Sequence, residues 1–199
     1  MAKRYDRDYF EQWYHDPAKR VITPAAVSRK VRLALGVAEA LLERPVRNVL
    51  DVGCGEGAWR EHLRRERPGL RYTGVESSEY AVERYGRSRN IVLGSFGSLA
   101  AVGLDGPYDL VVVCDVLQYV PSDQLGPGLA EVARLLGGVA FLEAYAIEDA
   151  IEGDRRAWHD RSAAAYLRYF GAAGLQGVGM HCYVGEALRE ATSALERRG

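Results

Sequence analysis

A run of glycines follows a short apolar stretch in the segment Val49-Leu-Asp-Val-Gly-Cys-Gly-Glu-Gly57. The apolar residues suit a buried parallel strand, and the three glycines remove side chains where the backbone must turn sharply and approach a ligand. Asp51 places a carboxylate just before this turn, and from Ala58 onward the pattern predicts a helix. A strand, a glycine turn and a helix in this order indicate a site for a bound cofactor.

A second acidic residue stands where it could reach the same ligand. The next predicted strand, Tyr72-Thr-Gly-Val75, ends in Glu76. In a doubly wound sheet this carboxylate lies at the carboxyl edge beside the glycine turn, where it can accept hydrogen bonds from both hydroxyls of a ribose. The sequence therefore predicts a sugar-binding carboxylate next to the turn.

Two classes of cofactor are compatible with these motifs. The segment Gly53-x-Gly55-x-x-Ala58, with Glu76 about twenty residues further on, satisfies the relaxed dinucleotide fingerprint of nicotinamide enzymes. Asp51, the third glycine of the turn, and Cys114-Asp115 at the end of a strongly apolar strand favour the other class. With them, the chain resembles the class I S-adenosylmethionine-dependent methyltransferases over roughly residues 45 to 180. The resemblance does not identify the methyl acceptor.

This resemblance implies S-adenosyl-L-methionine as cofactor, S-adenosyl-L-homocysteine as product, and a role for each matching residue. Asp51 would orient the amino group at the methionine end, and Glu76 would bind the ribose hydroxyls. Ser95 and Phe96 would face the adenine where the family often has Asp or Asn, and a serine hydroxyl binds the adenine amino group more weakly than a carboxylate does. For Asp115 a helix cap or turn role is the alternative. The expected cofactor-binding residues are Asp51, Gly53, Cys54, Gly55, Gly57, Glu76, Ser77, Ser95, Phe96, Asp115 and Val116.

The acceptor side is less defined. Tyr145 follows the fifth predicted strand, which directs it toward the site, and His159 could act as a general base near neutral pH. A surface histidine at a helix start is the plainer alternative. The aromatic residues of segment 5–16 could fold over the cofactor and exclude water, or simply pack in the core. Candidates for the acceptor pocket are Tyr9, Trp13, Tyr14, Tyr119 and Arg156, of which the arginine would favour an anionic acceptor.

Composition indicates one compact enzyme. The chain has 199 residues, 48% apolar and 27% charged, and a formal net charge of −1. Because this charge provides no overall field to hold phosphates, nucleic acid is not favoured as substrate. No signal-peptide pattern or long apolar span is evident, so a cytoplasmic protein without membrane contact is expected. Three widely separated cysteines fit neither a disulfide framework nor a metal site.

The pattern of elements predicts an α/β fold, a three-layer αβα Rossmann-like sheet that is mostly parallel. We expect residues 1–44 to form an N-terminal helical lid or extension, with a helix from Thr23 to about Glu43, and residues 45–199 to form the catalytic domain. The tail departs from the family pattern. Either a final antiparallel strand is missing or the run 175–184 splits into two strands, and an atypical C-terminal helix follows, whose surface or an exposed sheet edge could serve a homodimer. Strands are expected near 47–52, 71–75, 90–93, 109–114, 138–144 and 175–184, and the other helices near 58–67, 78–86, 123–136 and 155–173.

The leading functional hypothesis is methyl transfer to a small-molecule acceptor by in-line displacement, because the chain lacks a basic field or an added nucleic-acid domain. Protein or RNA methylation is the second hypothesis. A non-catalytic module that binds the cofactor is the third, and a hydride-transfer enzyme is the fourth.

Overall fold

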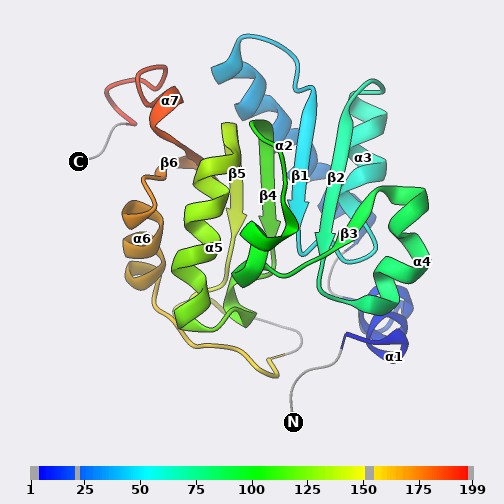
Figure 1. The fold of residues 1–199 in the computed structure, drawn as a ribbon. Coiled ribbons are helices and arrows are strands. Elements are labelled where there is room, and N and C mark those ends of the chain that lie inside the picture. Colours follow the sequence, from blue (N-terminus) through cyan, green and yellow to red (C-terminus); the bar gives the residue numbers. More distant parts are fainter. Residues whose placement is uncertain (1–4, 21–22, 151–154, 197–199) are drawn as a thin grey trace.

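The computed structural model describes residues 5–20, 23–150 and 155–196. Its sheet has seven strands in the order β3-β2-β1-β4-β5-β7-β6, and Figure 1 shows the long parallel strands ending at one edge. Strands β1 to β5 are parallel and β7 is antiparallel to both of its neighbours. The strands are β1 (Asn48–Val52), β2 (Arg71–Glu76), β3 (Ile91–Leu93), β4 (Tyr108–Cys114), β5 (Leu136–Glu143), β6 (Gln176–Gly179) and β7 (Cys182–Val184).

Each face of the sheet is covered by helices, which confirms the predicted three layers. On β4, Val111 and Val113 face one apolar cluster, whereas Leu110 and Val112 face the other. The first cluster includes residues of α5 (Ser122–Leu135), α6 (Ala163–Ala172) and the 3₁₀ segment η2 (Phe96–Val102), and the second includes residues of α2 (Pro24–Leu42) and α3 (Ala58–Glu66). Burial on both faces explains why these strands are almost continuously apolar. Helix α4 (Glu79–Arg89) connects β2 to β3.

The N-terminal segment begins with α1 (Arg7–Phe10) and a π-helical turn, η1 (Glu11–His15), at the carboxyl edge of the sheet (Figure 1). Helix α2 then starts as predicted, because the Thr23 hydroxyl accepts a hydrogen bond from the Ala26 N–H and Pro24 occupies the first turn. It ends at Leu42, before Glu43 in a left-handed conformation. Within the described residues, no helix is both long and apolar enough to span a bilayer.

The end of the chain resolves one open alternative. The run 175–184 divides into β6 and β7, which form an antiparallel hairpin added to β5. Met180 and His181 make its two-residue turn, both with positive φ (49° and 63°), as the turns that match strand twist require. The C-terminal helix α7 (Glu186–Arg189) is present but spans only 4 residues.

The helix predicted for residues 155–173 is wrong in its first half. Helix α6 starts only at Ala163, where the Ser162 hydroxyl caps it by accepting from the Ala165 N–H. Ala157 has a φ of +61°, which a right-handed helix cannot contain. The segment 155–162 is instead an irregular connection held by tertiary contacts.

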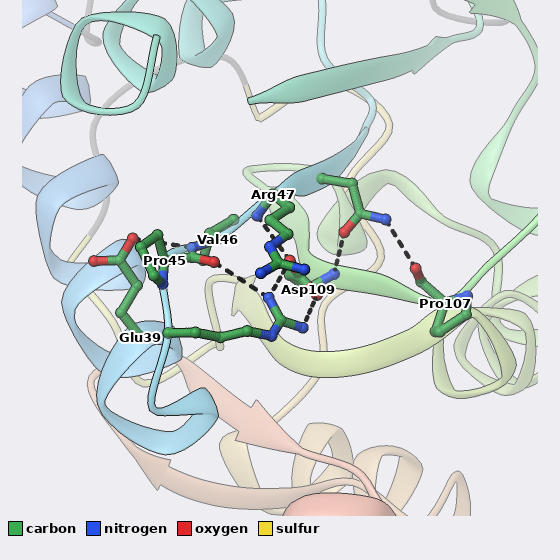
Figure 2. Close-up of polar contacts among 8 residues, drawn as sticks. Glu39, Pro45, Val46, Arg47, Pro107 and Asp109 are labelled. Atoms are coloured by element: carbon green, nitrogen blue, oxygen red, sulfur yellow. Dashed lines mark hydrogen bonds and ion pairs between the residues drawn. The ribbon is translucent and has the colours of Figure 1, made fainter. Parts of the chain in front are cut away.

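A polar cluster ties the amino ends of β1 and β4 together, opposite the glycine turn (Figure 2). Arg44 donates two hydrogen bonds to Asp109, of 2.8 and 2.7 Å, and the Arg47 N–H donates a third of 2.7 Å. The Asn48 side chain accepts from the Asp109 N–H at 2.8 Å and donates to the Pro107 carbonyl at 3.0 Å. Burial opposes the charge on Asp109, but these hydrogen bonds outweigh it, so the pKa of Asp109 is lowered.

We expect Asp109→Asn to reduce the free energy of unfolding by about 2 kcal/mol at pH 7, because it leaves Arg44 half-buried without its carboxylate. A lowered folded-state pKa stabilises the protein above the unfolded-state value and loses that effect as pH falls through the folded-state pKa. The difference between wild type and variant should therefore shrink below about pH 4. Urea denaturation at pH 7 and pH 3.5 measures this. Glu61→Gln, at the exposed Arg65–Glu61 pair, is the control, with a loss below about 0.5 kcal/mol.

Candidate functional site

The turn after β1 needs glycine at two positions for two separate reasons. Gly53 and Gly55 have φ angles of +72° and +56°, which strain any other residue. A Cβ at Gly53 would lie 2.4 Å from Val116 Cγ2, and one at Gly55 would lie 2.5 Å from the Tyr14 hydroxyl. The backbone here is therefore approached closely from both sides, as a ligand-binding turn requires. Gly57, also left-handed, is instead the N-cap of α3 and lines neither of the two cavities described below.

Glu76 lies beside this turn, as the parallel pairing of β1 with β2 predicts. Its carboxylate is buried and accepts from the Gly55 N–H at 2.7 Å and from the Ser78 N–H at 2.9 Å. The Ser77 hydroxyl donates to it at 3.2 Å. Because each carboxylate oxygen has two lone pairs, Glu76 can still accept from ribose hydroxyls while these bonds hold it in place.

A cavity of about 200 Å³, called the smaller cavity, opens next to Glu76. Its walls combine the glycine turn, the aromatic N-terminal segment, the start of η2 and the loop after β4. Most of the residues expected to contact the adenosine meet here. The expected residues that line it are Tyr9, Tyr14, Gly53, Gly55, Glu76, Ser77, Ser95, Phe96, Asp115, Val116 and Tyr119.

A cavity of about 440 Å³, the larger cavity, lies on the other side of the turn. It shares Tyr14, Gly53 and Cys114 with the smaller cavity, so the two spaces meet over the glycine turn. Its walls are largely aromatic and apolar, and several basic residues also line it. The residues that distinguish it include Trp13, Arg20, Val27, Lys30, Asp51, Cys54, Trp59, His62 and Arg65.

Tyr14 lies between the two cavities with its hydroxyl against Gly55. Its ring packs on Phe10 with centroids 4.9 Å apart. Burial, with the nearby Tyr9 and Glu76, raises the pKa of Tyr14 well above its usual value, so the phenol stays protonated at neutral pH. A ligand that occupies both cavities must pass this ring.

Asp51 borders the larger cavity and is buried, with the Tyr72 hydroxyl donating to it at 2.8 Å. Burial raises the pKa of Asp51 to about 7, with the hydrogen bond from Tyr72 opposing this shift and Glu76 adding to it. The carboxylate therefore gains its charge near neutral pH, where an ammonium group in the cavity would favour the ionised form.

This charge predicts a pH effect on binding. If Asp51 pairs with the amino group of S-adenosylhomocysteine, the ligand's affinity should rise roughly tenfold between pH 6 and pH 8 as the carboxylate ionises. Asp51→Asn should remove that rise in calorimetric titrations; an unchanged pH slope would contradict the pairing.

The same pKa also predicts an effect on stability. A raised folded-state pKa destabilises the protein as pH rises toward that pKa, so ligand-free Asp51→Asn should be more stable than wild type at pH 8, by about 2 kcal/mol.

Lys30 on α2 lines the larger cavity, although it is not among the site residues expected from the sequence. Its ammonium lies 2.5 Å from Glu143 Oε2 at the end of β5, and the Cys114 thiol donates to the same oxygen at 3.0 Å. Burial lowers the pKa of Lys30, but Cys114 and Glu143 outweigh this, so the pKa is raised and the lysine is charged. The available signal was its spacing, because Lys30 falls between Val27 and Ala34 on the apolar stripe.

Tyr145, His159 and Arg156 lie away from both cavities. Tyr145 and His159 line a separate recess of about 40 Å³ with Trp158, whose ring stacks on Tyr145 at 6.2 Å. Burial raises the pKa of Tyr145 to about 12, so its phenol is protonated at neutral pH. His159 and Arg156 are exposed. Their catalytic or acceptor roles stay predictions. In the described residues, no group of His, Cys, Asp and Glu is arranged to hold a metal.

Comparisons with known proteins identify the family and the fold of this chain. A family model described as a methyltransferase domain matches residues 25–191. DesVI of Streptomyces venezuelae superposes with a TM-score of 0.60 at 19% identity, covering 77% of this chain and 84% of the other. A SAM-dependent methyltransferase from Archaeoglobus fulgidus gives 0.65 at 17%, covering 86% and 74%. Magnesium protoporphyrin IX methyltransferase from Synechocystis, with SAH bound, gives 0.57 at 18%, covering 76% and 73%. The search of curated proteins returned no match.

The family model spans most of the chain, and the structural likenesses agree on its fold. The chain therefore belongs to the methyltransferase-domain family, with the fold of the class I S-adenosylmethionine-dependent methyltransferases. S-adenosylmethionine is its cofactor, and the glycine turn with Glu76 fits that group, since neither Gly53 nor Gly55 leaves room for a side chain.

Proposed function

We propose that this enzyme transfers a methyl group from S-adenosylmethionine to a small-molecule acceptor, with the ligands bound across the two cavities. The observation that carries the proposal is the meeting of a smaller cavity that holds Glu76 with a larger cavity that holds Asp51, over one glycine turn. The adenosyl end of the cofactor belongs in the smaller cavity and the methionyl end beside Asp51.

In the smaller cavity, Glu76 accepts the ribose hydroxyls and Phe96 packs against the adenine. Ser95 offers a hydroxyl, which already pairs with Ser98 at 2.8 Å and can still exchange hydrogen bonds with the base. Asp115 and Val116 close the wall above Gly53. These roles place every adenosyl contact on the carboxyl edge of the sheet, where ligands of doubly wound folds bind.

The protein does not need to form a covalent bond with either ligand for methyl transfer to occur. The bound cofactor supplies a sulfonium whose methyl carbon is electrophilic. This chain's residues then have to place an acceptor lone pair in line with that carbon and exclude water. Trp13, Tyr14 and Trp59 supply an aromatic wall for this in the larger cavity. Tyr14 lies between the cavities, so cofactor binding moves its ring or presses it against the ligand.

A small acceptor suits a cavity of about 440 Å³ that already has to hold the methionyl end of the cofactor. The structural neighbour from Synechocystis is named for an acceptor that is neither protein nor nucleic acid, magnesium protoporphyrin IX. Protein or RNA methylation, a non-catalytic cofactor-binding role, a cytoplasmic location and a homodimer are further hypotheses, as is the division into a lid (residues 1–44) and a catalytic domain (residues 45–199).

Calorimetry and product analysis test the proposal in order. S-adenosylhomocysteine should bind and raise the melting temperature, whereas NAD should do neither. A panel of small phenols, amines and carboxylic acids, assayed for release of S-adenosylhomocysteine, should then yield at least one acceptor. Binding without turnover on the small molecules, but with turnover on protein or RNA, would replace the proposed acceptor class. Binding of NAD alone would overturn the proposal entirely.

A further inference from the structure

Arg161 is a buried arginine whose two terminal nitrogens donate to oxygens of the protein, whereas its buried Nε has no hydrogen-bond partner. It lies in the connection between β5 and α6 and is 7% exposed. Among the described residues, no carboxylate lies within ion-pair distance of it. Its charge is met instead by three oxygens and by the ring of Tyr166, whose centroid is 5.8 Å from the guanidinium carbon. A buried cation without a carboxylate is costly unless its hydrogen bonds are satisfied, so what it binds is informative.

All three oxygens belong to the segment that follows β4. Arg161 Nη1 donates to the Leu117 carbonyl at 3.2 Å, and Nη2 donates to the Val120 carbonyl at 2.6 Å and to the Ser122 hydroxyl at 3.0 Å. The neighbouring His159 N–H donates to the Gln118 carbonyl at 2.8 Å. Segment 159–161 thus binds three backbone carbonyls of the loop 115–122, those of Leu117, Gln118 and Val120.

This loop forms one wall of the smaller cavity, through Asp115, Val116, Tyr119, Val120 and Pro121. Its conformation is not one that its own sequence favours. Asp115 has a φ of +61°, and Gln118, which donates to the Asp115 carboxylate, is fully buried with its Oε1 lacking a partner. Strained residues of this kind persist only where surrounding contacts hold them.

The segment that holds the loop is itself anchored. The Ile147 N–H donates to the Arg161 carbonyl at 2.9 Å, which ties the arginine to the irregular segment that follows β5. Helix α6 begins directly after it, capped by Ser162. Arg161 therefore connects the loop to the start of α6 and to the segment that follows β5.

We propose that Arg161 is a positioning residue for cofactor binding. By holding the carbonyls of Leu117 and Val120, it fixes the conformation of the loop 115–122, which forms one wall of the smaller cavity. The inference rests on the proposed function, which places the adenosyl group in the smaller cavity. Arg161 does not line that cavity and acts only through the backbone of the loop.

The test compares Arg161→Met with Arg161→Lys by calorimetric titration of S-adenosylhomocysteine. The methionine variant donates no hydrogen bond, so the Kd should rise at least about tenfold. The lysine variant can still reach one of the three oxygens and should recover part of the affinity, and it remains informative if the methionine variant does not fold. Arg168→Met on the exposed face of α6 is the matched surface control and should leave the Kd unchanged.

Two further measurements separate positioning from general stability. Asp109→Asn, which weakens the opposite edge of the sheet, should lower the melting temperature without raising the Kd. Hydrogen exchange of ligand-free Arg161→Met should be faster at the amides of residues 117–121 than in wild type. An unchanged Kd in Arg161→Met, an equal rise in Asp109→Asn, or unchanged exchange in the loop would each overturn the inference. Failure of wild type to bind S-adenosylhomocysteine would instead overturn the proposed function, and the exchange experiment would still decide whether Arg161 holds the loop.

Discussion

Glu76→Ala is expected to weaken the binding of S-adenosylhomocysteine by about a hundredfold, since two hydrogen bonds from hydroxyls to a buried carboxylate together contribute about 3 kcal/mol. The carboxylate is held for this task by the N–H groups of Gly55 and Ser78. Its loss therefore removes the ribose contact and also frees the glycine turn. Calorimetric titration of the variant gives the change in Kd directly.

Two variants sharpen this experiment. Glu76→Gln keeps one carbonyl oxygen as an acceptor and should lose less affinity than the alanine variant, on the order of tenfold. Glu79→Ala removes an exposed carboxylate three residues away that lines neither cavity, and should bind as wild type does. Undiminished binding by Glu76→Ala would remove the central contact of the proposed site.

The turn and Glu76 were predictable because their positions follow from local rules. Nearly continuous burial defines β1 and the second half of β2, and the parallel register brings Asp51 opposite Gly74, one position before β1 ends. Once adjacent strands are parallel, their carboxyl ends meet at one edge whatever the rest of the chain does. The same reasoning placed Asp115 at the end of β4, which pairs with the other side of β1.

Lys30 was not predictable in the same way. Its partner Glu143 is 113 residues away, on a strand whose position cannot be inferred from the spacing of apolar residues along α2. A charged helix residue usually extends its charge into solvent, even where it lies on an apolar stripe, and only the packing of α2 across β4 and β5 buries this one. Long-range pairing of side chains is decided by tertiary packing, which local patterns do not encode.

The irregular segment before α6 shows a second limit. Its composition suits a helix, yet Trp158 packs between Tyr145 and Tyr119 and Arg161 binds the loop after β4. Those tertiary contacts require directions that a continuous helix could not provide. Weak helix propensity, worth a few tenths of a kcal/mol per residue, is overridden by such burial.

Lys30→Met should cause the largest loss of stability of the variants considered, about 3 kcal/mol in the free energy of unfolding at pH 7. The substitution leaves Glu143 buried, with the Cys114 thiol as its remaining described donor. Removing one partner of a buried ion pair is far more costly than the pair's net contribution, because an uncompensated charge stays behind. Urea denaturation measures the loss, and Lys19→Met at the exposed Lys19–Asp16 pair is the matched control, below about 0.5 kcal/mol.

The double variant Lys30→Met/Glu143→Leu separates the structural role of the ion pair from its role in ligand binding. Since the stranded carboxylate is gone, most of the lost stability should return. The larger cavity would then lack its ammonium, so the affinity for a ligand that contacts Lys30 stays reduced although the fold has recovered. If the single variant loses no more stability than Lys19→Met, the ion pair at the end of β5 is not the buried contact that its 2.5 Å separation indicates. If stability and ligand affinity return together, Lys30 supports the wall of the cavity without touching what binds there.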